Sequence, residues 1–169
     1  MDLDESMAGD FAHGTCHTQE AVIYGTDEKK DVSGGWHDAG AYGKYVVTGA
    51  QTAIDLLLCY EDNKDMWSRD DLNIPESGNG IPDIIDEVRY ELDWLLKMQD
   101  ESTGGVWHKV STYNFPAFIM PQDDKDELVI SPISTTATGD FAAIMAKASV
   151  VYSEYDKDFS QKCLNAAEN

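Results

Sequence analysis

Basic residues are scarce in this sequence of 169 residues, in which 12 lysines and arginines stand against 32 aspartates and glutamates. The formal net charge at pH 7 is therefore −20. A surface this acidic repels phosphate backbones and anionic lipids, so we expect neither nucleic acid nor a membrane as a partner. It suits a neutral ligand such as a sugar, or bound Ca²⁺, although solubility alone accounts for most of these charges. Long apolar runs are also missing, since none approaches the roughly 18 residues of a membrane-spanning helix.

Cysteine is also rare, and the odd, sparse set of Cys16, Cys59 and Cys163 excludes a disulfide framework. Cys59 and Cys163 lie on the apolar sides of expected helices, so we expect both in the core. At least one cysteine, Cys16, needs another explanation. The first ten residues, MDLDESMAGD, are acidic and polar and are not a signal peptide. If the parent protein is secreted, we expect its signal to lie outside this chain.

The spacing of apolar residues predicts a mainly helical chain. A short strand is expected at VWHKVST, and the connection NFPAFIMPQDDKDELVISP that follows is long and marked by prolines, as functional loops often are. The last expected helix is still amphipathic where the sequence stops, so we expect part of a larger all-α domain. Apolar residues recur at helical spacing in four stretches, which are residues 41–60, 82–96, 136–152 and 158–167.

One short stretch, DVSGGWHDAGAYGK, has the composition of an active-site turn. Two glycines, a Trp and a His lead into Asp38, just before the first expected helix. A carboxylate there can do acid–base work, but such chemistry usually takes a pair, and Ala41 stands where a partner would share the same face. By itself Asp38 is also compatible with a plain helix N-cap. Glu87 and Glu91, in the second expected helix, are expected to be solvated.

Two sets of residues have the chemistry of metal ligands. Cys16 and His17 are followed by His37, and thiolate and imidazole are good Zn²⁺ ligands, of which structural zinc takes four. The alternative is a buried cysteine with two polar histidines. The loop SRDDLNIPESGNG and the helix start after it are rich in oxygen ligands, which suit Ca²⁺ or are simply solvated. The candidate calcium ligands are Asp71, Asn73, Asp83 and Asp86.

Several longer strings, in the same order and spacing, resemble glycoside hydrolase family 9, and its bacterial cellulase branch in particular. These are DVSGGWHDAGAYGKYVV, NGIPDIIDEVRYELDWLLKMQ, GGVWHKV, FPAFIMP and STTATGDFAAIMAKAS. The resemblance implies an all-α fold, an (α/α)6 barrel of twelve helices, of which residues 1–169 would form the N-terminal portion. It also implies hydrolysis of internal β-1,4-glucosidic bonds in cellulose and related β-glucans.

The family motif Asp-Ala-Gly-Asp assigns roles to Asp38 and Ala41. In the family the two carboxylates hold and deprotonate the attacking water, and the bond is cleaved with inversion, while a Glu late in the domain protonates the leaving oxygen. Asp38 matches the first Asp, but Ala41 takes the place of the general base. Losing a general base typically costs about 10²–10⁴ in rate. The close match of the flanking residues favours a deliberate inactivating change over natural loss.

The same resemblance implies ligands for metals and sugar. Some bacterial members hold a zinc with two Cys and two His, and Cys16, His17 and His37 match three of these, while the fourth would precede Met1. Members also bind calcium in a similar loop. A His near the position of His108 contacts sugar in the family, and aromatic side chains stack on pyranose rings, a role we expect for Trp36 and Trp107.

Three other interpretations remain open. An exo-acting relative, such as a β-glucosidase or an exo-β-glucosaminidase, would differ by loops that block the cleft. A non-catalytic glucan-binding pseudoenzyme would carry Ala41 naturally. A stand-alone metal-binding helical domain is disfavoured by the unfinished last helix. A glucan-degrading protein would act outside the cell, so we expect it to be secreted.

Overall fold

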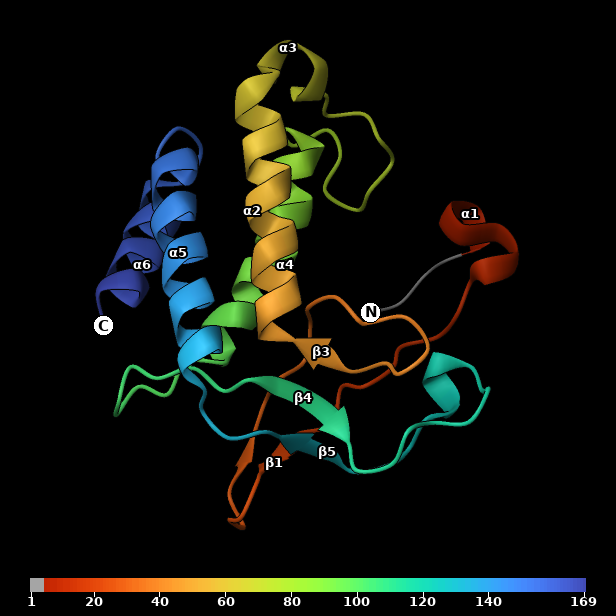
Figure 1. Cartoon of the computed structure of the whole chain (residues 1–169). Coiled ribbons are helices and arrows are strands. Elements are labelled where there is room, and N and C mark those ends of the chain that lie inside the picture. Colours follow the sequence, from red (N-terminus) through yellow and green to blue (C-terminus); the bar gives the residue numbers. More distant parts are fainter. Residues whose placement is uncertain (1–4) are drawn as a thin grey trace.

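The computed structural model describes residues 5–169, in which a layer of helices stands on a small mixed sheet (Figure 1). In this part of the chain no helix combines the length and the apolar character that crossing a membrane requires. Four short helical segments flank the main elements: α1 (Glu5–Ala8), η1 (Gly9–Phe11), α3 (Lys64–Trp67) and η2 (Pro121–Asp123). The four long helices are α2 (Val46–Asp62), α4 (Asp83–Lys97), α5 (Thr135–Tyr152) and α6 (Lys157–Glu168).

The sheet has five strands in the order β2-β1-β5-β4-β3. Strands β1 and β5 are parallel, and the other neighbours are antiparallel. The all-α prediction is therefore wrong, and only β4 was expected. The other strands have only two or three residues each, and apart from the local pairing of β1 with β2 they pair with distant parts of the chain, as Val22 does with Val129, so they leave no clear periodic pattern. The strands are β1 (Ala21–Ile23), β2 (Lys29–Lys30), β3 (Lys44–Tyr45), β4 (Lys109–Thr112) and β5 (Leu128–Ile130).

The helical layer is held together by one apolar core. Helix α5 packs against α6 and α2, and α2 packs against α4. The periodicity placed α4, α5 and α6 correctly to within about two residues, and it placed Cys163 correctly in the core, where its side chain is fully buried. Cys59, by contrast, lies on the exposed side of α2, so its expected place in the core is wrong. The buried residues at the centre include Ala50, Leu57, Val88, Leu92, Phe141, Ile144 and Met145.

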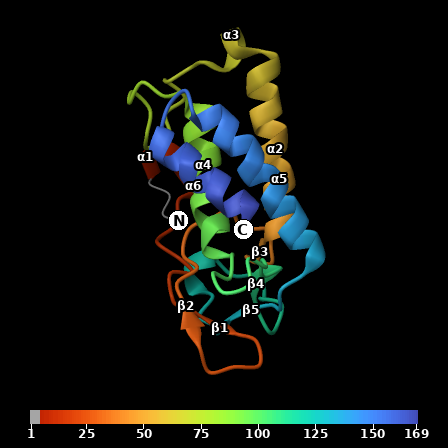
Figure 2. The same cartoon turned by 90° about the vertical axis from the view of Figure 1, so that its left-hand side faces the viewer.

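The start of α2 lies five residues later than the expected helix. Residues 39–41 form a turn and Lys44–Tyr45 form strand β3, so the helix begins only at Val46. The backbone N–H of Val46 donates to the carbonyl of His108, which ties the base of α2 to the sheet. The segment 31–43 thus lies where the helices meet the sheet, as the second view also shows (Figure 2).

Candidate active site

The turn at Asp38 is closed by a hydrogen bond from its own backbone N–H to the carbonyl of Gly43, at 2.7 Å. Gly40, at φ +78°, and Tyr42, at φ +51°, take the left-handed conformation that so tight a turn requires. Asp38 is exposed and Ala41 is half-buried. Both belong to this turn, so Ala41 does not begin the helix that was expected over residues 41–60.

Asp38 borders two hollows. One, of about 250 Å³, is lined also by Trp36, His37 and residues at the base of α2. The other, of about 220 Å³, lies toward Cys16 and Pro121. The carboxylate at the head of the turn is therefore open to a ligand on either side.

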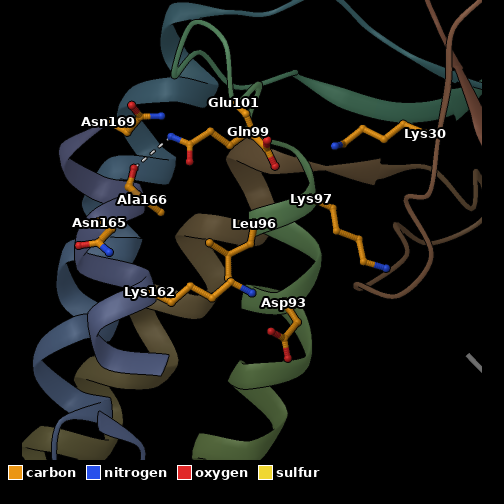
Figure 3. Close-up of a pocket in the computed structure, with 10 residues that line it drawn as sticks. All are labelled: Lys30, Asp93, Leu96, Lys97, Gln99, Glu101, Lys162, Asn165, Ala166 and Asn169. Carbon is orange, nitrogen blue, oxygen red and sulfur yellow. Dashed lines mark hydrogen bonds between the residues drawn. The ribbon is translucent and has the colours of Figure 1, made fainter. Parts of the chain in front are cut away.

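A larger hollow lies elsewhere, at the C-terminal ends of α4 and α6 (Figure 3), and has a volume of about 770 Å³. It contains none of the predicted site residues. The amide of Gln99 spans it by donating to the carbonyl of Ala166 at 3.0 Å. Its lining includes the basic residues Lys30, Lys97 and Lys162, whereas no lysine or arginine of the described residues lines either hollow at Asp38.

The segment before Asp38 is held by Lys44, whose side chain is only 1% exposed. Its ammonium donates to the carbonyl oxygens of Val32 and, at 2.9 Å, of Gly34. Burial lowers the pKa of Lys44 to about 8. The lysine of β3 thus fixes the backbone of the loop that leads into the turn.

Helix α4 also holds this segment. The buried carboxylate of Glu91 accepts the backbone N–H of Trp36 at 2.6 Å, and Glu87 accepts its indole N–H at 2.7 Å. Burial raises the pKa of Glu91 to about 7. The expectation that Glu91 is solvated is therefore wrong. Its position between Val88 and Leu92 on the apolar face was the signal that could have revealed it.

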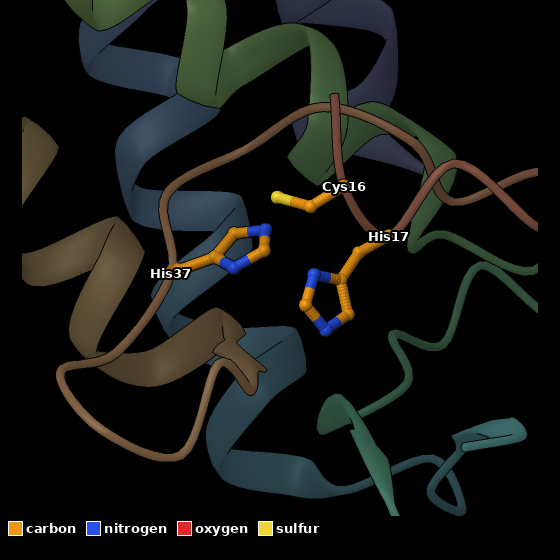
Figure 4. Close-up of side chains that lie close together, drawn as sticks. All are labelled: Cys16, His17 and His37. Carbon is orange, nitrogen blue, oxygen red and sulfur yellow. The ribbon is translucent and has the colours of Figure 1, made fainter. Parts of the chain in front are cut away.

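Cys16, His17 and His37 come together as the zinc hypothesis requires. One ligand atom of each lies within 4.8 Å of those of the other two, and Figure 4 shows the sulfur and the two rings turned toward one another. Ligand atoms bonded to one ion at 2.0–2.3 Å lie no more than about 4.6 Å apart, so these three atoms are close to the spacing that a shared zinc requires. His17 takes a left-handed conformation, φ +50°, to reach this place.

The surroundings of His17 fit a metal ligand. Its Nε2 lies 3.3 Å from a carboxylate oxygen of Asp124, while its buried Nδ1 has no hydrogen-bond partner in the described structure. Burial lowers the pKa of His17, and burial together with His17 lowers that of His37 to about 3, so both rings are neutral, as ligands must be. Sequence reasoning missed Asp124, whose only signal was its place in the long connection.

The predicted sugar-binding residues are only partly brought together. Trp36 borders a hollow with Asp38. His108 lies at the base of α2, with Nδ1 3.0 Å from the Ser134 hydroxyl. Trp107 is 9% exposed, lies beneath the Lys30 ammonium and borders a different hollow. A role in sugar binding stays a prediction for all three.

The four candidate calcium ligands are not gathered around one point. Asp83 is buried, and its carboxylate accepts the Leu72 N–H and the Ser77 hydroxyl. Asp86 accepts from the amide of Asn79. Within residues 5–169 no second set of three His, Cys, Asp or Glu is close enough to hold an ion. Calcium stays a prediction for Asp71, Asn73, Asp83 and Asp86.

Curated relatives cover the chain almost completely. Endoglucanase D of Acetivibrio thermocellus is 46% identical over 162 residues, which are 94% of this chain and 26% of that protein. A cellodextrinase of Butyrivibrio fibrisolvens is 44% identical over 167 residues, or 96% of this chain and 30% of that protein. The chain thus spans between about a quarter and a third of the length of these relatives.

Solved structures share the fold. A Bacteroides ovatus GH9 protein has a TM-score of 0.94 and 37% identity, covering 99% of this chain and 33% of its own. AaCel9A in complex with cellobiose-like isofagomine has a TM-score of 0.87 and 42% identity, covering 99% of this chain and 32% of its own. A Zn-binding triple mutant of the endoglucanase J30 has a TM-score of 0.84 and 36% identity, covering 93% of this chain and 31% of its own.

The family model described as Glycosyl hydrolase family 9 matches residues 3–169. With a family model over nearly its whole length and relatives above 40% identity, the chain belongs to glycosyl hydrolase family 9.

Proposed function

We propose that residues 1–169, of which 1–4 lie outside the described structure, form the N-terminal portion of a catalytic domain that hydrolyses internal β-1,4-glucosidic bonds with inversion. The observation that carries this proposal is the turn at Asp38, which is exposed between two hollows and fixed by Lys44 and Glu91. Endoglucanase and cellodextrinase activities of the relatives support the same substrate class. The remainder of the domain is then the partner of this chain.

Of the two carboxylates that would act on the attacking water, this chain supplies only Asp38. An inverting glycosidase needs a base that activates water on one face of the sugar and an acid on the other, with carboxyls roughly 6.5–9.5 Å apart. Asp38 can accept a hydrogen bond from that water. Ala41 lies in the same turn but offers only a methyl group, so this chain lacks a proton acceptor at the base position.

Zinc is proposed to bind through Cys16, His17 and His37. The donor set, the buried Nδ1 of His17 without a partner, and the carboxylate of Asp124 behind its Nε2 all fit a structural zinc site. The Zn-binding variant of endoglucanase J30 supports the same metal. Zinc there would be structural, since it would join the N-terminal segment to the residue beside Asp38.

The remaining ligands are proposed on weaker support. Trp36 and His108 would contact a β-1,4-glucan or cello-oligosaccharide, and the complex of AaCel9A with cellobiose-like isofagomine supports a ligand of this kind. Calcium in the loop at residues 68–82 rests on its oxygen-rich composition alone. Because β-glucan polymers lie outside cells, we expect the full protein to be secreted.

Restoring the carboxylate tests the proposal. The full-length protein and its Ala41→Asp variant should bind cello-oligosaccharides with similar affinity in calorimetry, because the change removes no sugar contact. In a reducing-sugar assay the Ala41→Asp variant should turn over at least about 10²-fold faster, since a base acts only in the transition state. Equal hydrolysis by both proteins would show that position 41 is not the base position.

A second candidate function is favoured by Ala41 itself, namely a glucan-binding pseudoenzyme. In that case the Ala41→Asp variant would bind but still not hydrolyse. An exo-acting enzyme would be recognised by its products, since it releases only short sugars from a soluble β-glucan and lowers the viscosity slowly. An endoglucanase lowers the viscosity within the first few cuts.

A further inference from the structure

Helix α4 presents three side chains at helical spacing toward the segment that leads into Asp38. Glu87 accepts the indole N–H of Trp36, Glu91 accepts its backbone N–H, and the ring of Trp94 lies against Gly35. These positions follow one another at i, i+4 and i+7, so they form one stripe on the helix. One rigid helix therefore contacts two consecutive residues of the segment.

Glu91 differs from its neighbours because its carboxylate is enclosed on every side. It is 1% exposed, and Oε1 lies so close to α2 that a Cβ added at Gly49 would come within 2.2 Å of it. Lys44, whose charge acts on Glu91, holds the carbonyl oxygens of Val32 and Gly34. Glu91 and Lys44 thus fix an amide group and two carbonyl groups of one short stretch.

We propose that Glu91 is a positioning residue for the active-site turn, acting through Trp36 to hold Asp38 in place. The proposal rests on the proposed function only in assigning chemistry to Asp38. Only His37 stands between Trp36, whose amide Glu91 fixes, and Asp38, whose own amide donates to the carbonyl of Gly43 at 2.7 Å. Without its acceptor, the Trp36 amide would be left unpaired in a part-buried place and the segment would shift. A displacement of about 1 Å in a catalytic group can cost about 10²-fold in rate.

The test compares two substitutions at Glu91 in the full-length protein carrying Ala41→Asp. Glu91→Leu removes the acceptor, whereas Glu91→Gln keeps an oxygen at the same reach. Val88→Ala is the matched control, because it removes buried volume from the same helix and no acceptor from the segment. We expect kcat to fall at least tenfold in Glu91→Leu, to stay within about threefold in Glu91→Gln, and to be unchanged in Val88→Ala although its Tm falls.

A second perturbation moves Glu91 without replacing it. Gly49→Ala places a methyl group against Oε1 and should lower kcat, because the flexible end of the glutamate is what must shift. Gly139→Ala is the control, since Gly139 also lies in a helix but a Cβ there meets nothing within 4 Å. Equal kcat in the two alanine variants would count against the proposal.

Hydrogen–deuterium exchange of residues 32–43 supplies a measurement that does not depend on hydrolysis. Exchange in this segment should become faster in Glu91→Leu and remain unchanged in Val88→Ala. If the Ala41→Asp protein does not hydrolyse glucan, the proposed function fails, and this comparison alone decides the role of Glu91. Unchanged exchange in Glu91→Leu, or a loss of kcat in Val88→Ala as large as that in Glu91→Leu, would overturn the proposal.

Discussion

Replacing Gly35 with alanine should destabilise the protein more than the same change at its neighbour Gly34. Both glycines take positive φ angles, +76° and +86°. A Cβ at Gly35 would lie 2.5 Å from Cγ and 2.7 Å from Cδ2 of Trp94, whereas a Cβ at Gly34 would meet nothing within 4 Å. Trp94 is 1% exposed, so its ring has no room to move aside.

Both substitutions lose stability by placing an L-residue at a positive φ angle, but only Gly35→Ala also overpacks the core. The left-handed conformation costs an L-residue about 1–2 kcal/mol, which we expect for Gly34→Ala. Gly35→Ala adds the overpacking of a filled core, typically about 1–3 kcal/mol, and should therefore lose about 2–5 kcal/mol. The difference between the variants isolates the contact of Gly35 with Trp94.

Urea denaturation followed by tryptophan fluorescence measures both free energies of unfolding. A double-mutant cycle provides the control, because Gly35→Ala should cost less stability in a Trp94→Leu background than in the protein that keeps Trp94. Equal losses for Gly34→Ala and Gly35→Ala, or a cycle with no coupling, would refute the close packing of the segment on α4.

Three further predictions concern the zinc site, the buried glutamate and a helix cap. Asp124→Ala should weaken zinc binding by about 10–100-fold in a chelator competition, because His17 loses the carboxylate behind its ring, and unchanged affinity would exclude that role. Glu91→Gln should flatten the dependence of stability on pH. Burial raises the pKa of Glu91 from 4.5 to about 7, so the protein with Glu91 should lose roughly 3 kcal/mol of stability as the pH rises through that window, measured by urea denaturation at each pH. Ser134→Ala should cost about 1 kcal/mol in thermal unfolding, because the hydroxyl accepts the Ala137 N–H at the start of α5, and no loss would contradict this capping role.

Local patterns predicted the long helices because their periodicity is carried by neighbouring residues. Helices α4, α5 and α6 follow from apolar side chains three and four positions apart, and β4 from the short stretch VWHKVST after Gly104 and Gly105. The start of α2 was missed because the Tyr42 side chain continues the helical spacing while its backbone, at φ +51°, belongs to the turn. Periodicity reports which side chains are apolar and not which backbone angles they take.

The candidate site was predicted to the extent that its residues lie close in sequence or match a known family. Cys16, His17 and His37 were proposed together, and they do meet. Asp124 was not proposed, since 107 residues separate it from His17 and only the path of the long connection brings it there.

The sequence alone determined the family and showed that Asp38 is followed by alanine at position 41, because these depend on residue identity and order. Only the tertiary structure decided that the chain contains a sheet, that Glu91 is buried and that it holds Trp36. From the sequence alone, an acidic residue within a helix is expected to be solvated, because the elements packed around it are not known. Burial and hydrogen bonding arise between α4, α2 and the segment 31–43, which the fold brings together from distant parts of the chain.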